Sequence, residues 1–271
     1  MIDPLVSRGR MVAVHCVVQL GILLTLTWKW TYFKWSDNLH EKITLADPFF
    51  PDWLESADVV RYAYLISLAV IVVNIVSWEK YLTRLCNYVT LACLSVLLIH
   101  QASYNDATFT TAWWACVWSV WYGHHMDDPD RIATLDRGAF LSRAMMSMVL
   151  LGGAVGKWTP EYWNGDVLYD IYFRDRNFWM FNYLRNTFEP DQLRVIATWY
   201  SRKVVAIETI CGFGLWLLPS RLAALIGLLV FTSIAIFSNI YLFSVMFALM
   251  GIAAVGLFVV KRPTHQLDLE A

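Results

Sequence analysis

Lys157 is the residue of this sequence with the clearest capacity for chemistry. It follows an apolar run, Met145–Gly156, that is typical of the second half of a membrane-spanning helix. A charged side chain at membrane depth is costly, so it needs a partner, a route to the interface or a chemical role. A desolvated amine can act as a base near neutral pH. The alternative is structural: the ammonium group would cap the last carbonyls of its helix and extend to the lipid headgroups.

A second charged residue, Glu208, lies well inside a later apolar segment, 199–218. A carboxylate within a membrane normally faces the interior of the helix bundle and pairs there. It could be protonated and donate to a backbone carbonyl, or it could contact Lys157, Arg202 or a ligand. We predict Lys157 and Glu208 as catalytic residues of one site, because an interacting amine and carboxyl can exchange a proton.

Four further residues are candidates for binding a polar ligand head. Asn105 and Asp106 stand just after the third apolar segment, and His100 lies about one helical turn earlier. Trp163 belongs to an aromatic turn that follows Lys157. Asn105 and Asp106 could instead turn the chain and cap the next helix, since Asn and Asp are favoured in both positions.

A run of histidine and aspartate, His124–Asp130, has the residue types of a metal site. A second cluster of this kind does not appear in the sequence, and a solvated loop at a helix end accounts for these residues as well. We therefore predict no metal cofactor. The motifs of nucleotide-binding loops, zinc proteases and α/β-hydrolases are also absent from the sequence.

The composition is that of an integral membrane protein. Of the 271 residues, 58% are hydrophobic and 16% charged, whereas soluble domains are about half apolar and about a quarter charged. The net charge of −1 gives no reason to expect a nucleic-acid partner. We predict an all-α fold: a polytopic bundle of about eight transmembrane helices forming one domain over residues 1–271. The predicted spans are 11–31, 59–78, 84–102, 107–123, 139–157, 199–218, 221–237 and 240–260.

Basic residues predict the orientation of these spans. Every short connection on one side of the predicted bundle carries lysine or arginine, and this side is expected to be cytoplasmic. Both termini would then face the cytoplasm of, for example, a bacterial cell, whose inner membrane is the expected location. The longer connections, 32–58 and 158–198, would face the periplasm together with Lys157. Because 158–198 is dense in aromatic residues, it is expected to form amphipathic helices on the membrane surface or over a cavity.

Three short stretches carry motifs of one known family. They are Gly153–Lys157 with the turn at Trp163–Gly165, then Glu208–Phe213 running to Ser220 and Arg221, and finally Ser103–Asp106 with His125 and Asp130 downstream. Together they resemble the vitamin K-dependent γ-carboxylases and their bacterial relatives, the horizontally transferred transmembrane (HTTM) proteins. Leu242-Phe243-Ser244 is similar to a further motif of the last span in that family.

The resemblance implies a reaction. Lys157 would be the base that takes a proton from a vitamin K- or menaquinone-type hydroquinone, which is the first step of its oxygenation to an epoxide. A strong base formed in that reaction would deprotonate a weak carbon acid, so that oxidoreductase and lyase chemistry are combined. The sequence departs from the family at Ala107 and Thr232, where relatives have histidine. The matching stretches also do not include the family's large extracytoplasmic domain, which binds protein substrates. We therefore expect quinol chemistry more readily than carboxylation of a glutamate.

Two alternatives of another class stay open. The chain could be a non-catalytic membrane anchor within a larger complex. It could also be a small quinone-interacting redox subunit similar to the DoxX group, whose members place Gly-x-x-Lys before an aromatic turn. The expected partners are membrane lipid, a quinone and, for these two alternatives, other membrane subunits.

The predicted orientation can be measured by cysteine labelling. A cysteine introduced at position 165 or 180 should react with an impermeant maleimide added outside the cell, because the basic connections place this segment on the outer side. A cysteine at position 133 should be protected until the membrane is opened. The reverse pattern would place Lys157 at the cytoplasmic face.

Overall fold

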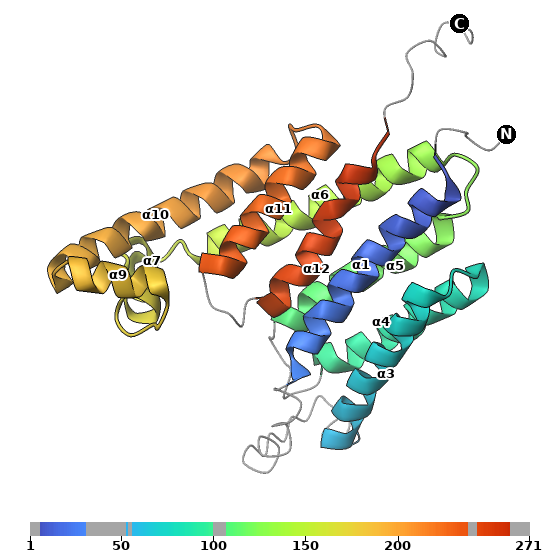
Figure 1. Ribbon diagram of the computed structural model, residues 1–271, viewed down its shortest axis with the longest axis horizontal. Coiled ribbons are helices and arrows are strands. Elements are labelled where there is room, and N and C mark those ends of the chain that lie inside the picture. Colours follow the sequence, from blue (N-terminus) through green and yellow to red (C-terminus); the bar gives the residue numbers. More distant parts are fainter. Residues whose placement is uncertain (1–5, 31–52, 54–55, 100–106, 238–242, 261–271) are drawn as a thin grey trace, which may run out of the picture. The chain divides into compact units, whose positions relative to one another are not determined.

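The computed structural model describes residues 6–30, 53, 56–99, 107–237 and 243–260, and throughout these residues it contains helices and no strand (Figure 1). The predicted all-α fold class is confirmed. The chain forms two compact units: unit 1 is Met1–Arg143 with Pro219–Ala271, and unit 2 is Ala144–Leu218. One long helix, α6, begins in unit 1 and ends in unit 2.

Each predicted span corresponds to a helix in the part of the chain that the structure describes. The helices are α1 (Arg8–Trp28), α3 (Ala57–Val76), α4 (Lys80–Ile99), α5 (Ala107–His125), α6 (Arg131–Gly156), α10 (Pro190–Gly214), α11 (Ser220–Phe237) and α12 (Phe243–Ala254), which continues as the 3₁₀ helix η5 (Val255–Phe258). Among the described residues, five helices are long and apolar enough to cross a membrane: α1, α3, α4, α6 and α11. The chain is therefore an integral membrane protein.

Local capping explains where several helices begin. The side chains of Ser7 and Ser56 accept hydrogen bonds from the first turns of α1 and α3. Glu79 accepts one from the backbone N–H of Leu82 at 2.7 Å at the start of α4, and backbone hydrogen bonds of this kind lower the pKa of the Glu79 carboxyl. Glu189 and Gln192 form a capping box, so α10 begins at Pro190 rather than near residue 199.

Small residues set the packing of unit 1. Helix α1 packs against α3, α5 and α12, and α4 packs against both α3 and α5; α3 and α4 lie side by side in Figure 1. A Cβ atom at Gly21 of α1 would lie 2.7 Å from the carbonyl oxygen of Phe247 and 3.2 Å from the Cα of Gly251, both in α12. The two backbones approach this closely because both positions are glycine, as is common at helix contacts in membranes.

Unit 2 combines the second half of α6 with α10 and a set of short helices. These are α7 (Pro160–Trp163), α8 (Asp166–Leu168), the π-helix η3 (Tyr169–Phe173) and α9 (Trp179–Thr187). Phe173 and Phe181 pack with Leu193 and Ala197 of α10 in a buried apolar cluster. The expected helices in the segment after Lys157 are therefore present, and they are folded onto α10 rather than forming an open loop.

A pair of glycine substitutions tests the close contact between α1 and α12. Gly21→Ala should lower the free energy of unfolding by about 1–3 kcal/mol, because the added methyl group overpacks a backbone contact. Gly152→Ala is the matched control, since nothing lies within 4 Å of a Cβ built there. The control should be neutral or stabilising by up to about 1 kcal/mol through helix propensity. Thermal unfolding in detergent, followed by circular dichroism, measures both; equal midpoints would contradict the contact.

Candidate functional site

Lys157 and Glu208 form a close ion pair within unit 2. The Nζ atom of Lys157 lies 2.6 Å from both Oε1 and Oε2 of Glu208, so the ammonium group can donate to both carboxylate oxygens. Glu208 is buried, with 7% of the residue exposed, and the side chain of Lys157 is 26% exposed. Of the partners considered for Glu208 from the sequence, the structure selects Lys157. Charge-assisted hydrogen bonds of this kind are short and strong.

The end of α6 brings the amine to the carboxylate. Gly156 is the last residue of α6, and Lys157 follows in a turn in which its backbone N–H donates to the carbonyl of Ala154 at 3.0 Å. Gly153 lies one turn earlier, where a Cβ atom would be 3.4 Å from both Lys157 Nζ and Glu208 Oε2. The ion pair therefore lies directly over the backbone of α6, where a larger side chain would crowd it.

A second close contact fixes α10 against this part of α6. Glu208 and Gly212 are four residues apart on one face of α10, and Trp216 follows just after this helix ends. The Oγ of Ser147 donates to the carbonyl of Gly212 at 2.7 Å and accepts from Nε1 of Trp216 at 2.8 Å. A Cβ atom at Gly212 would lie 2.7 Å from the side chain of Leu151. This contact sets the register that places Glu208 opposite Lys157.

Tyr162 places an aromatic ring close to the ion pair. The centre of its ring lies 6.0 Å from Lys157 Nζ, and 9% of the residue is exposed. Burial raises the pKa of the Tyr162 phenol, and the negative charge of Glu208 raises it further, so Tyr162 stays neutral. A neutral phenol beside the pair adds a hydrogen-bonding group without adding charge. The sequence analysis did not select Tyr162, although its place within the aromatic turn was visible there.

Trp163 packs on the outer part of α10. It is 46% exposed. Arg202 lies over its ring at 5.6 Å from the ring centre, and Nε of Arg202 donates to the carbonyl of Trp163 at 3.3 Å. Arg202 is thus engaged by the turn after Lys157, whereas Glu208 is engaged by Lys157.

Gly165 has a structural reason to be glycine. Its φ of 84° lies in the left-handed region, and a Cβ atom would be 2.5 Å from the backbone nitrogen of Thr198. The carbonyl of Asn164 accepts from Oγ1 of Thr198 at 2.6 Å. The turn at Trp163–Gly165 therefore attaches the segment after Lys157 to α10. A cysteine side chain at position 165 would clash with α10. Position 180 is therefore the better of the two outer positions for the cysteine labelling described above.

The other candidate residues fall into two groups. His100, Asn105 and Asp106 lie outside the described residues. In the run His124–Asp130, Nδ1 of His125 is 2.8 Å from Oδ2 of Asp128, and His124 contacts the hydroxyl of Tyr88 at 2.8 Å. Within the described ranges, no group of three or more His, Cys, Asp and Glu side chains could hold a metal ion.

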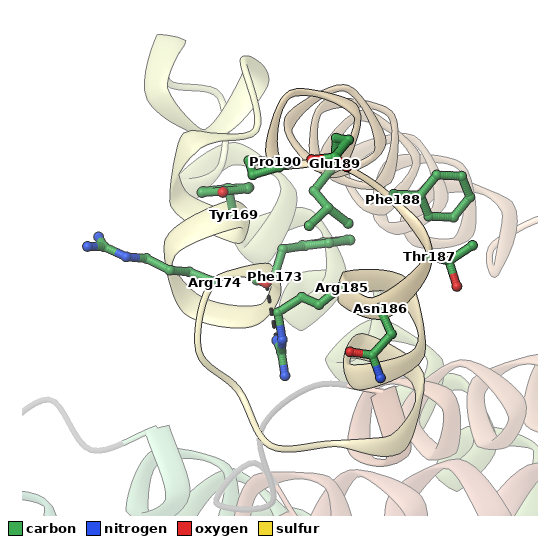
Figure 2. Close-up of a pocket in the computed structure, with 10 residues that line it drawn as sticks. Tyr169, Phe173, Arg174, Arg185, Asn186, Thr187, Phe188, Glu189 and Pro190 are labelled. Carbon is green, nitrogen blue, oxygen red and sulfur yellow. Dashed lines mark hydrogen bonds between the residues drawn. The ribbon is translucent and has the colours of Figure 1, made fainter.

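A separate pocket of about 340 Å³ lies in unit 2 where α9 ends and α10 begins (Figure 2). Its lining includes Tyr169, Phe173, Arg185 and Glu189, but neither Lys157 nor Glu208. The guanidinium of Arg185 donates to the carbonyls of Phe173 at 3.1 Å and Arg176 at 2.7 Å. Its charge is thus used to hold the short helices together.

No model of a known protein family matches the chain, and neither a curated protein nor a solved structure does. The function of this protein is therefore inferred from the geometry of the site residues.

Exchanging the two charges tests whether the ion pair stabilises unit 2. Lys157→Glu and Glu208→Lys should each lower the free energy of unfolding, because each places like charges together; losing one partner of a fully buried pair costs about 3–5 kcal/mol. Partial exposure of Lys157 should bring the cost to the lower end of that range or below. The double variant should recover a large part of it.

Denaturant unfolding of the four proteins gives the coupling energy as a double-mutant cycle. Effects of the two single changes that simply add in the double variant would contradict the pairing. Lys203→Glu, at an exposed position of α10, is the matched control and should show no coupling to Glu208→Lys.

Proposed function

We propose that this chain is a membrane-embedded, vitamin K-dependent carboxylase-like protein in which the Lys157–Glu208 pair removes a proton from a quinol. The observation that carries the proposal is the contact of Lys157 Nζ with both oxygens of a buried carboxylate at 2.6 Å. An amine and a carboxyl so placed share a proton readily, and pairs of titratable groups in low-dielectric surroundings are common at proton-transfer sites. The family motifs around both residues are consistent with this role.

The pair can accept one proton while keeping charge balanced. In its ionic form, the Glu208 carboxylate accepts the proton of a quinol hydroxyl, and the Lys157 ammonium stabilises the resulting anion. In its neutral form, the Lys157 amine accepts the proton directly, while Glu208 already carries its own. Both routes end with an ammonium group, a neutral carboxyl and a deprotonated quinol. Vitamin K hydroquinone or menaquinol would supply the acidic hydroxyl and, with oxygen, the oxidising chemistry.

The surroundings of the pair suit an isoprenoid quinol. Tyr162 offers a neutral aromatic ring whose centre lies 6.0 Å from the amine. Apolar side chains close to both residues in sequence are exposed, namely Val155 at 72% and Ile210 at 69%. Exposed apolar surface on a membrane protein faces lipid, from which an isoprenoid ligand would enter. Short helices over α10 would exclude water from the reaction, which strengthens electrostatic interactions.

The same geometry supports a second candidate, a quinone-interacting or anchoring subunit of a larger membrane complex. The Ser147–Gly212 and Trp216–Ser147 hydrogen bonds hold α10 to α6 independently of any chemistry. An ion pair beside such a joint could serve assembly alone. In either case we place the protein in a bacterial inner membrane, with both termini in the cytoplasm and the pair towards the periplasm.

Quinol turnover should depend on Lys157 and on pH. Because the pair can accept a quinol proton by either route only when it holds a single proton itself, epoxide formation should rise with pH as a second proton is lost from the pair. Lys157→Ala should lower turnover by roughly 10²–10⁴-fold, the usual loss when general acid–base catalysis is removed, and should change quinol affinity much less. Purified protein supplied with reduced vitamin K or menaquinol, oxygen and bicarbonate can be assayed for epoxide by chromatography.

Lys203→Ala is the control, because this lysine lies exposed on α10 and should leave turnover unchanged. Equal, negligible epoxide from the wild type and from Lys157→Ala would contradict the proposal for these substrates. A membrane protein that then co-purified with both forms would favour the anchoring subunit.

A further inference from the structure

Unit 1 contains a buried polar cluster that the proposed function does not use. His15 and Gln19 of α1, Asn74 of α3 and Asn87 of α4 are each at most 1% exposed. They lie in helices that are otherwise apolar enough to cross a membrane. Polar side chains at such depth are uncommon, and they have to find partners within the protein. The neighbouring helix α5 leaves space for this cluster, because Gly123 has no side chain. A Cβ atom at Gly123 would lie 2.7 Å from Nδ2 of Asn87.

One backbone carbonyl fixes the direction of the hydrogen bonds between the amides. The carbonyl of Ser119 can only accept, so the contact at 2.9 Å identifies the donor as Nδ2 of Asn87. Oδ1 of Asn87 therefore faces the network and accepts from Nδ2 of Asn74 at 2.7 Å and from Nε2 of Gln19 at 3.0 Å. Turning any of these amides over would oppose two oxygens or two NH₂ groups.

The same reasoning assigns the protonation of His15. Since Nδ2 of Asn74 is a donor to Asn87, the other amide atom of Asn74 is an oxygen and can only accept. It lies 3.1 Å from Nε2 of His15, so this ring nitrogen carries the proton. In the neutral imidazole, Nδ1 is then an acceptor with a bare lone pair.

Three buried polar atoms around this network have no partner among the described residues. They are Nδ1 of His15, Oε1 of Gln19 and Oγ1 of Thr90. His15 and Gln19 are four residues apart on one face of α1, and Thr90 is three residues after Asn87 on one face of α4. The Gln19–Asn87 hydrogen bond joins those two faces. The hydroxyl of Ser119, by contrast, donates to the carbonyl of Ala115 at 3.0 Å.

We propose that these three atoms form an internal water-binding site between α1 and α4. Nδ1 of His15 and Oε1 of Gln19 are acceptors, and the hydroxyl of Thr90 can donate. One water molecule can donate two hydrogen bonds and accept another, so it can satisfy all three atoms. The water donates to His15 Nδ1 and Gln19 Oε1 and accepts from Thr90 Oγ1. Buried waters typically make about three hydrogen bonds to otherwise unsatisfied groups, as here.

A proton bound at His15 Nδ1 is the competing occupant. It would turn Nδ1 into a donor, although Nδ1 has no hydrogen-bond partner among the described residues. A buried positive charge also needs a nearby counter-charge. In the described structure the side chains that hydrogen-bond with this ring and with its amide partners are neutral amides, and a carboxylate is not among them. A neutral water molecule satisfies the three atoms without that cost.

The state of His15 can be read by solid-state NMR on the full-length protein in lipid bilayers at pH 7, with ¹⁵N in the histidine rings. His15→Gln identifies the resonances. We expect a protonated Nε2, an unprotonated Nδ1, and magnetisation transfer from water to Nδ1. A protonated Nδ1 would overturn the proposal in favour of the proton, and an unprotonated Nδ1 without transfer from water would overturn it as well.

A threonine pair then tests the third ligand. Thr90→Val removes the hydroxyl with little change of shape and should abolish the transfer from water to Nδ1. Thr111→Val is the matched control, because Thr111 is also buried but its hydroxyl donates to the carbonyl of Thr108 at 3.0 Å. The control should keep the transfer. Undiminished transfer in Thr90→Val would remove Thr90 from the site.

Discussion

Every polar group buried among these helices has to be satisfied by the protein or by water held inside it, because lipid offers no hydrogen bonds. Backbone groups meet this requirement by forming helices, and side chains meet it in two different ways. In unit 2, Lys157 and Glu208 neutralise each other across 2.6 Å. In unit 1, His15 and its amide partners use neutral hydrogen bonds. A charged pair can exchange a proton, whereas an amide network mainly holds helices in one register.

Glycine makes both arrangements possible. Gly153 leaves room for the ion pair over α6, and Gly123 leaves room for the Asn87 amide over α5. Gly212 lets the Leu151 side chain of α6 lie against α10 one turn beyond Glu208. At each position a methyl group would meet a polar group or a neighbouring side chain at 3.4 Å or less. The polar sites therefore depend on positions that carry no side chain, and a hydropathy pattern registers those positions only weakly.

Apolar windows were sufficient to predict the helices, because chain length and hydrophobicity determine a span almost alone. The pairing of Lys157 with Glu208 was also foreseeable, since each is a charge within an apolar segment and needs a partner. The start of α10 was placed too late, although Glu189 and Gln192 carry the capping-box signal. The network around Asn87 was not predicted. Its residues were visible, but which of them meet depends on the rotation of four helices about their axes, and spacing along one chain does not contain that information.

The geometry of the ion pair also constrains how it can act. As long as the proton stays on Lys157, the amine has no lone pair to offer and Glu208 is the only basic group of the two. Under the proposed function, a quinol would react either by giving its proton to Glu208 or after the proton of Lys157 has moved to Glu208. In both cases Glu208 would end protonated and Lys157 would end as an ammonium group. Under this proposal the reactivity of Lys157 depends on Glu208, and the contact between α6 and α10 holds the two groups at 2.6 Å.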